Sequence, residues 1–203
     1  MSSNEEIFLP FPGPVEALPV VSQCKSTLLV NSVRGLRDHG HFERYEALLD
    51  PQFRDTVLSA IAGVWMPIEA GAAHYRAIDS LGLTPLEQSR LGSAASERLG
   101  SSVFSTIATL AKTSGVTPWT GLRYFQRFFD RFFVGGGAQV LKLGPKDARI
   151  DVVGLPLLDI PYFVNAYRVL IEALGVPFFC QKLYVTVVPR VVPASVAFRG
   201  SWV

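Results

Sequence analysis

The sequence predicts an α+β fold, in which an N-terminal helical half precedes a four-stranded antiparallel sheet in the chain order β-β-α-β-β. Two patterns predict it. Apolar residues recur at helical spacing up to about residue 135, and at alternate positions over most of the remaining chain. Strands and helices do not alternate regularly along the chain, so an antiparallel sheet with helices packed on one face is favoured over a parallel sheet.

Composition excludes several classes of protein. The 203 residues fit one ordinary domain, and with 49% hydrophobic residues the chain can bury enough surface to fold. A net charge of +2 gives no reason to expect a nucleic-acid partner, and no apolar run approaches the roughly 20 residues of a membrane span. Cys24 and Cys180 are too few for a disulfide framework, which fits a reduced, cytoplasmic setting.

The chain divides into an arm and a folded unit. Residues 1–25 contain four prolines and little periodicity, which predicts an extended N-terminal arm. Residues 26–203 are expected to form a single α+β domain, helical over 26–135 and sheet-containing over 136–203.

Helix start signals are clear at two places. Asp50 precedes Pro51, a cap followed by a proline in the first turn, where a missing N–H has no consequence. Thr84, Pro85 and Glu87 predict a capping box, in which the threonine and glutamate side chains satisfy each other's backbone N–H groups. Together with the periodicity, these signals predict helices over residues 26–38, 42–48, 51–62, 67–80, from 84 onward, 101–112 and 117–133.

The most strongly patterned segment is the last of these helices, TPWTGLRYFQRFFDRFF. Its phenylalanines share one face, which either fills an ordinary core or lines a pocket. Arg123, Arg127 and Arg131 repeat every four residues on another face, either as a solvated surface or as contacts for an anion. We assign an apolar pocket between helices and sheet to Phe125, Phe128, Phe129, Phe132, Trp119 and Tyr167.

The pattern changes after Gly135, Gly136 and Gly137, which we interpret as a helix stop. The rest of the chain predicts strands at 138–143 and 149–153 with a turn at 144–147, a helix at 161–174, and strands at 178–188 and 195–203. The terminal strand, which ends in Trp202 and Val203, is expected at an edge of the sheet, where it could pair with a partner.

No catalytic or metal-binding motif is present in the sequence. The chain lacks the glycine pattern of dinucleotide-binding folds, a P-loop and a nucleophile elbow, and its two cysteines and three histidines show no zinc spacing. No set of residues meets the requirements of a catalytic site. We therefore expect a binding protein rather than an enzyme, and no metal site.

His74 is the histidine with the clearest chemical alternatives. It falls on the inward face of the helix at 67–80, beside Tyr75 and Arg76, which could join it in a polar network. A buried imidazole either makes a hydrogen bond to a neighbour in the core or ligates a metal such as heme iron. The sequence leaves both interpretations open.

Three stretches of the sequence carry a resemblance: VWMPIEAGAAHYRAIDSLGLTPLEQSRLG, TPWTGLRYFQRFFDRFFVGGG and LGPKDARIDVVGLPLLDIPYF. They resemble a family of uncharacterised proteins abundant in myxobacteria, over about residues 26–203. That family is in turn distantly similar to the heme–nitric-oxide-binding and 4-vinyl-reductase domains. In those domains N-terminal helices precede a four-stranded antiparallel sheet with a helix inserted midway, and the resemblance implies the same fold here.

The resemblance also shows departures from the heme sensors. Those proteins carry a proximal histidine on the helix before the sheet, whereas residues 124–133 contain no histidine. They hold the heme propionates with a Tyr-x-Ser-x-Arg motif, and the corresponding residues Val152–Pro156 have neither a hydroxyl nor a guanidinium group. Heme bound in the manner of the sensors is therefore not expected, and His74 would have to supply the iron ligand from another helix.

These observations lead to three functional hypotheses. The first, which we favour, is a regulatory or sensory module that holds a small apolar molecule between helices and sheet. The second is a protein that binds heme or another tetrapyrrole, with His74 as the axial ligand. The third is a non-catalytic scaffold or dimerisation domain, whose partner is a second copy or another protein.

Overall fold

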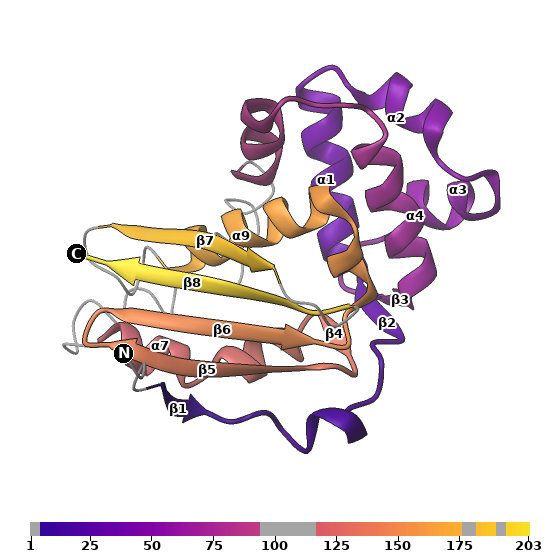
Figure 1. The fold of residues 1–203 in the computed structure, drawn as a ribbon. Helices are drawn as coiled ribbons and strands as arrows, with labels where there is room; N and C mark the ends of the chain where they lie inside the picture. Colours follow the sequence, from indigo (N-terminus) through magenta and orange to yellow (C-terminus); the bar gives the residue numbers. More distant parts are fainter. Residues whose placement is uncertain (1–4, 94–116, 176–181, 190–193) are drawn as a thin grey trace.

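The computed structural model describes residues 5–93, 117–175, 182–189 and 194–203. Helices from the first part of the chain gather at one end of a twisted antiparallel sheet, and helices from later in the chain lie along the sheet (Figure 1). The predicted helix at 101–112, the first part of the predicted strand at 178–188, and Cys180 lie outside the described residues. Within the described part of the chain, no helix is long and apolar enough to cross a membrane.

The helical half forms where the capping signals predict it. The Asp50 side chain accepts a hydrogen bond from the Gln52 N–H at 2.9 Å. The Thr84 N–H donates to Glu87 at 2.8 Å, and the Glu87 N–H points back to the Thr84 hydroxyl at 3.4 Å, which confirms the capping box. The helices are α1 (Ser26–Asp38), α2 (Phe42–Leu48), α3 (Pro51–Leu58), α4 (Ile68–Asp79) and a further helix described over residues 85–93.

The prediction of one long aromatic helix over 117–133 is wrong. The segment forms two short helices, α7 (Pro118–Leu122) and α8 (Phe125–Phe129), which are separated at Tyr124, and then the strand β4 (Phe133–Val134). The strand takes the place of the last helical turn because β4 pairs with β2 (Gln23–Lys25) in the arm. Backbone pairing with a segment more than a hundred residues away thus outweighs the local helical pattern.

The main sheet has five strands in the order β1-β5-β6-β8-β7, all antiparallel, rather than the four predicted. The additional strand comes from the arm and pairs with β5 at the edge of the sheet. The terminal strand is not at an edge, as predicted, but between β6 and β7, so the true edges are β1 and β7. The strands are β1 (Glu6–Leu9), β5 (Gly137–Gly144), β6 (Asp147–Val153), β7 (Leu183–Pro189) and β8 (Val196–Trp202).

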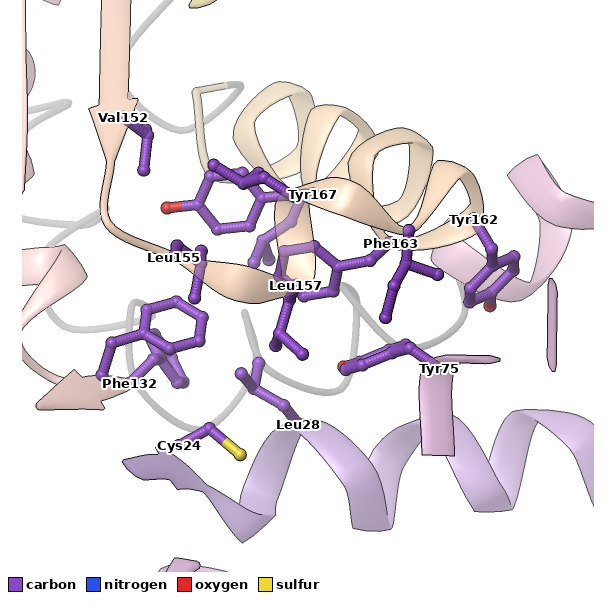
Figure 2. Close-up of a cluster of buried hydrophobic side chains, with 14 of the residues drawn as sticks. Cys24, Leu28, Tyr75, Phe132, Val152, Leu155, Leu157, Tyr162, Phe163 and Tyr167 are labelled. Atoms are coloured by element: carbon purple, nitrogen blue, oxygen red, sulfur yellow. The ribbon is translucent and has the colours of Figure 1, made fainter. Parts of the chain in front are cut away.

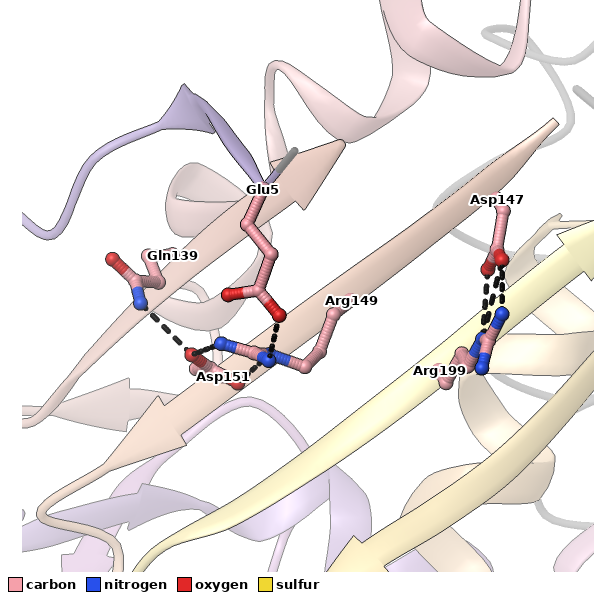
Figure 3. A network of polar contacts seen from close by, with 6 residues as sticks. All are labelled: Glu5, Gln139, Asp147, Arg149, Asp151 and Arg199. Carbon is pink, nitrogen blue, oxygen red and sulfur yellow. Dashed lines mark hydrogen bonds and ion pairs between the residues drawn. The ribbon is translucent and has the colours of Figure 1, made fainter. Parts of the chain in front are cut away.

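A polar network on one face of the sheet holds the arm in place (Figure 3). The Arg149 side chain donates to Asp151 at 3.0 Å and to Glu5 at 2.7 Å, and Gln139 donates to Asp151 at 2.8 Å. Asp151 is fully buried, so these charge-assisted bonds compensate for its lost hydration. Since Glu5 directly precedes β1, the same arginine links the buried carboxylate to the edge strand.

At the other edge of the sheet, a glutamate side chain accepts a backbone N–H of the strand β7. The helix α9 (Pro161–Gly175) packs against β7, and its Glu172 accepts the Val185 N–H at 3.1 Å. Glu172 also pairs with Arg168 one turn earlier, at 2.8 Å. Because this edge N–H already has an intramolecular partner, it is less available for a backbone hydrogen bond with a strand of another molecule.

The prediction that the three consecutive glycines stop a helix is wrong, because they follow the strand β4 and lead into β5. The arm contacts this connection. The Gly136 N–H donates to the Pro19 carbonyl at 2.6 Å, and the Val21 N–H donates to Gly154 at 2.8 Å. Gly136 has a φ of +67°, and a Cβ there would lie 2.8 Å from Val21 Cγ2 and 2.9 Å from the Val153 carbonyl oxygen. Only glycine permits this conformation together with such close approach.

We therefore predict that Gly136→Ala lowers the free energy of unfolding by about 2–4 kcal/mol, because strain from the positive φ adds to a steric clash. Gly40→Ala is the matched control, since Gly40 has a φ of +72° but nothing within 4 Å of its Cβ position. That variant should lose only about 1 kcal/mol. Urea unfolding of both variants measures the difference, and equal losses would contradict the proposed close packing.

Candidate ligand site at the helix–sheet junction

A small cavity lies where the helical half meets the sheet half. Its volume is about 40 Å³, and its walls come from both halves and are mostly apolar. By volume it holds about three water-sized groups. Figure 2 shows several of the lining side chains converging between α9 and α1. The cavity is lined by Leu28, Ser32, Tyr75, Gly92, Phe132, Phe133, Tyr162, Phe163, Ala166, Tyr167 and Leu170.

The helix α9 supplies the largest share of this wall. Tyr162, Phe163, Ala166, Tyr167 and Leu170 repeat at a spacing that places them on one side of the helix. At its N-terminus the Tyr162 N–H donates to an Asp79 side-chain oxygen at 2.8 Å. Because Asp79 is the last residue of α4, this bond caps α9 and ties it to the helical half.

Ring packing around the cavity connects the two halves. Phe163 stacks on Tyr167 with ring centroids 5.6 Å apart and meets Tyr75 edge-on at 4.8 Å. Tyr167 also contacts Phe133 at 6.4 Å and Phe198 of β8 at 5.5 Å. Such aromatic pairs contribute about 0.5–1.5 kcal/mol each beyond the area they bury. The rings therefore hold the junction together and leave little open volume.

Three tyrosine hydroxyls are buried at this junction. Burial raises the pKa of Tyr75, Tyr162 and Tyr167, so all three stay protonated and can donate hydrogen bonds. The Tyr162 hydroxyl is hydrogen-bonded to Ser32. The Tyr167 hydroxyl has no partner among the described residues, and Figure 2 shows it pointing toward Val152 and away from the axis of α9.

The residues that the sequence assigned to an apolar pocket do not all lie at this cavity. Phe132 and Tyr167 are in its wall. Phe125 and Phe129 are buried elsewhere in the core, and Phe128 is partly buried against it. Trp119 lies at the other end of the sheet, between the rings of Phe8 and Trp202.

Most of the wall was not identified from the sequence. Leu28, Ser32, Tyr162 and Phe163 could have been noticed, because they lie on the apolar or small-residue faces of helices that were correctly placed. No local signal shows that these faces meet, since the contact joins residues more than a hundred positions apart.

His74 lies in the helical half, fully buried, and is not among the residues that line the cavity. Its Nδ1 is 2.7 Å from the Tyr45 hydroxyl, and its ring meets Tyr75 edge-on at 4.8 Å. Its Nε2 has no partner among the described residues. Burial lowers the pKa of His74 to about 3, so the imidazole is neutral at physiological pH. Of its predicted companions, Tyr75 reaches the cavity wall, whereas Arg76 is exposed.

The predicted arginine stripe is interrupted by the break in the aromatic helix. Arg123 follows α7 and lies over the Phe8 ring at 5.9 Å, whereas Arg127 belongs to α8 and lies over Tyr124 at 5.6 Å. Arg131 follows α8, and all three side chains are exposed. They no longer share one helical face. Across the described residues there is also no cluster of three or more histidine, cysteine or acidic side chains that could hold a metal ion.

Within the described residues, the site at the helix–sheet junction does not fit heme. By the resemblance, heme would lie between the helix before the sheet and Val152–Pro156, and the side chains of Phe129, Phe132 and Leu155 in these segments are buried in the core. A cavity of about 40 Å³ is far below the roughly 300–1,000 Å³ of pockets for drug-sized molecules. The imidazole of His74 lies outside the cavity wall and already bonds Tyr45.

Because His74 is buried and neutral, it makes the folded state less stable as the pH falls. Its pKa is about 3 in the folded protein and about 6.5 when unfolded, so only the unfolded chain takes up a proton between these values. Stability is complete above pH 6.5 and falls as the pH drops toward 3. At pH 5 the loss is about 2 kcal/mol relative to pH 7.5.

We expect His74→Gln to remove this part of the acid destabilisation, whereas His39→Gln, which changes an exposed histidine, should retain it. Denaturant unfolding at pH 7.5 and pH 5 measures both. An equal loss in the wild type and in His74→Gln would show that His74 is not held neutral by burial.

Comparison with solved structures identifies H-NOX domains. A structure from work on heme distortion in the H-NOX family has a TM-score of 0.56 at 10% identity, and the match covers 88% of this chain and 94% of that one. A mutant of the T. tengcongensis H-NOX gives 0.55 at 9% identity, over 88% and 97%. An oxygen-binding H-NOX domain related to soluble guanylate cyclases gives 0.51 at 12% identity, over 88% and 94%.

No protein-family model and no curated protein matches the chain. The likeness at these identities therefore concerns the fold alone. It agrees with the element order and the antiparallel sheet described above, and it confirms the distant resemblance to the heme–nitric-oxide-binding domains. The chain has the fold of the H-NOX domains.

Proposed function

We propose that this protein is a sensory or regulatory module that binds a small apolar molecule, without heme, at the helix–sheet junction. The position of the cavity supports this proposal. Its walls combine α1 and α4 from the helical half with α9, which packs on the sheet. The fold-level likeness to H-NOX domains, one of them described as oxygen-binding, agrees with a ligand-responsive role.

A ligand at this position can change how closely the helical half and the sheet half pack together. It would touch Leu28 of α1 and Tyr75 of α4 on one side, and Phe163 and Ala166 of α9 on the other. A ligand shifts a conformational equilibrium only by the difference in its affinity for the two states. Contacts with both halves make the affinity depend on how closely the halves approach.

The size of the cavity limits the ligand and its affinity. Space for about three water-sized groups admits a molecule of three or four non-hydrogen atoms without movement of the rings. At a ceiling of about 1.5 kcal/mol per atom, such a ligand binds with a Kd no tighter than roughly tens of micromolar. The module would therefore respond to a small molecule present at tens of micromolar or above.

Xenon tests the cavity because it is apolar and occupies small hydrophobic cavities. We expect methyl resonances of Leu28 and Leu170 to shift in a saturable manner under xenon pressure. Ala166→Leu adds volume to the cavity wall and should abolish the saturable shifts, because the added side chain takes the same space.

Val164→Leu is the matched control, since Val164 lies on the same helix, is similarly half-buried and does not line the cavity. This variant should bind xenon like the wild type. Unchanged shifts in Ala166→Leu would mean that xenon binds elsewhere, and the absence of saturable shifts in the wild type would refute the proposed site.

A further inference from the structure

The Tyr75 hydroxyl is a hydrogen-bond donor at the cavity without an acceptor among the described residues. Tyr75 is only 5% exposed, and burial raises its pKa, so the hydroxyl stays protonated. Its side chain lines the cavity, and Figure 2 shows the hydroxyl pointing from α4 toward Leu28 of α1, which lines the same cavity. The hydroxyl is therefore directed into the space between the two halves that a ligand would occupy.

Tyr167, the other tyrosine of this junction whose hydroxyl has no partner in the described structure, has a different geometry. Its oxygen is closed even to a molecule of the size of water, and it points toward Val152, which does not line the cavity. The Tyr75 oxygen is not closed in this way. The two hydroxyls thus form a matched pair, of which only that of Tyr75 can meet a molecule in the cavity.

Ring packing does not explain the Tyr75 hydroxyl. The Tyr75 ring meets His74 and Phe163 edge-on, in both cases with ring centroids 4.8 Å apart. Phenylalanine would make the same ring contacts, and a buried hydroxyl without a partner destabilises the folded state. The oxygen is favourable in the folded protein only if a bound molecule accepts its hydrogen bond.

The surroundings of the hydroxyl define the chemistry of that molecule. The cavity walls are mostly apolar, and the hydroxyls of Ser32 and Tyr162, two other lining residues, already bond each other. Water is a poor occupant, because a buried water needs two to four polar partners. A molecule with one acceptor and an otherwise apolar surface matches the site better, because its remaining atoms require no hydrogen bonds.

We propose that the ligand is a compound of three or four non-hydrogen atoms with one carbonyl-type oxygen, which accepts a hydrogen bond from the Tyr75 hydroxyl. This inference rests on the proposed function and adds the polar contact that would orient the ligand. The oxygen would face the helical half, and the apolar part of the molecule would lie against Leu28 and Phe163. Small ketones and aldehydes have this chemistry.

Acetone and 2-methylpropene test this contact, because they share a shape of four non-hydrogen atoms and differ in one oxygen. Each is titrated into the wild type, Tyr75→Phe and Tyr167→Phe, with methyl resonances of Leu28 and Leu170 as the readout. We expect Tyr75→Phe to weaken acetone binding about fivefold relative to 2-methylpropene, which is the effect of one hydrogen bond. In Tyr167→Phe the affinity ratio should match that of the wild type, because the Tyr167 oxygen is closed off and points away from the cavity.

The outcomes separate this inference from the proposed function. If both probes bind and Tyr75→Phe leaves their affinity ratio unchanged, the carbonyl contact is wrong and the apolar site stands. The contact is also wrong if Tyr167→Phe changes the ratio as much as Tyr75→Phe does. If neither probe shifts the cavity resonances in the wild type, both the contact and the proposed site are refuted.

Thermal unfolding without ligand controls for the fold. Tyr75→Phe should unfold at the same temperature as the wild type or higher, because the hydroxyl that it removes has no acceptor in the free protein. A lower unfolding temperature would show that the hydroxyl already bonds within the protein, and this result would overturn the inference.

Discussion

The aromatic side of α9 packs against both halves of the molecule and holds them together. Phe163 and Tyr167 contact Tyr75 on the helical side, and Phe133 and Phe198 on the sheet side. The backbone of α9 is fixed at its start by the carboxylate that ends α4. One helix thereby sets the distance between the halves. The arm reinforces this arrangement, because it pairs with β5 through its first strand and with β3 (Trp65–Pro67) and β4 through its second.

The elements that local signals encode could be predicted from the sequence, and those that depend on distant partners could not. The helix α1, the capping box at Thr84 and the order β-β-α-β-β follow from periodicity and capping. The aromatic helix over 117–133 was mispredicted because its last residues pair with the arm, which no helical pattern reveals. The sequence likewise does not show that β8 lies inside the sheet and β1 at its edge. Which antiparallel strands pair depends on tertiary packing.

The same distinction applies to the candidate site. Phe132 and Tyr167 could be assigned to a pocket because they lie on strongly apolar helical patterns, but the cavity also needs Ser32 and Tyr162, whose facing positions depend on how α1 meets α9. His74 illustrates the limit of reasoning from residue type. Its burial could be predicted from its helical face, yet only the structure shows that its Nδ1 bonds Tyr45 and that it is absent from the cavity wall.

The chain has the fold of the H-NOX domains, and we propose that its own side chains fill the space that heme would need. Hemin titration, followed by absorption near the Soret region, is the test of this proposal. We expect no saturable, stoichiometric spectral change in the wild type, because Phe129, Phe132 and Leu155 are packed in the core and His74 lies outside the cavity wall. A one-to-one heme complex whose Soret band disappears in His74→Ala would contradict it.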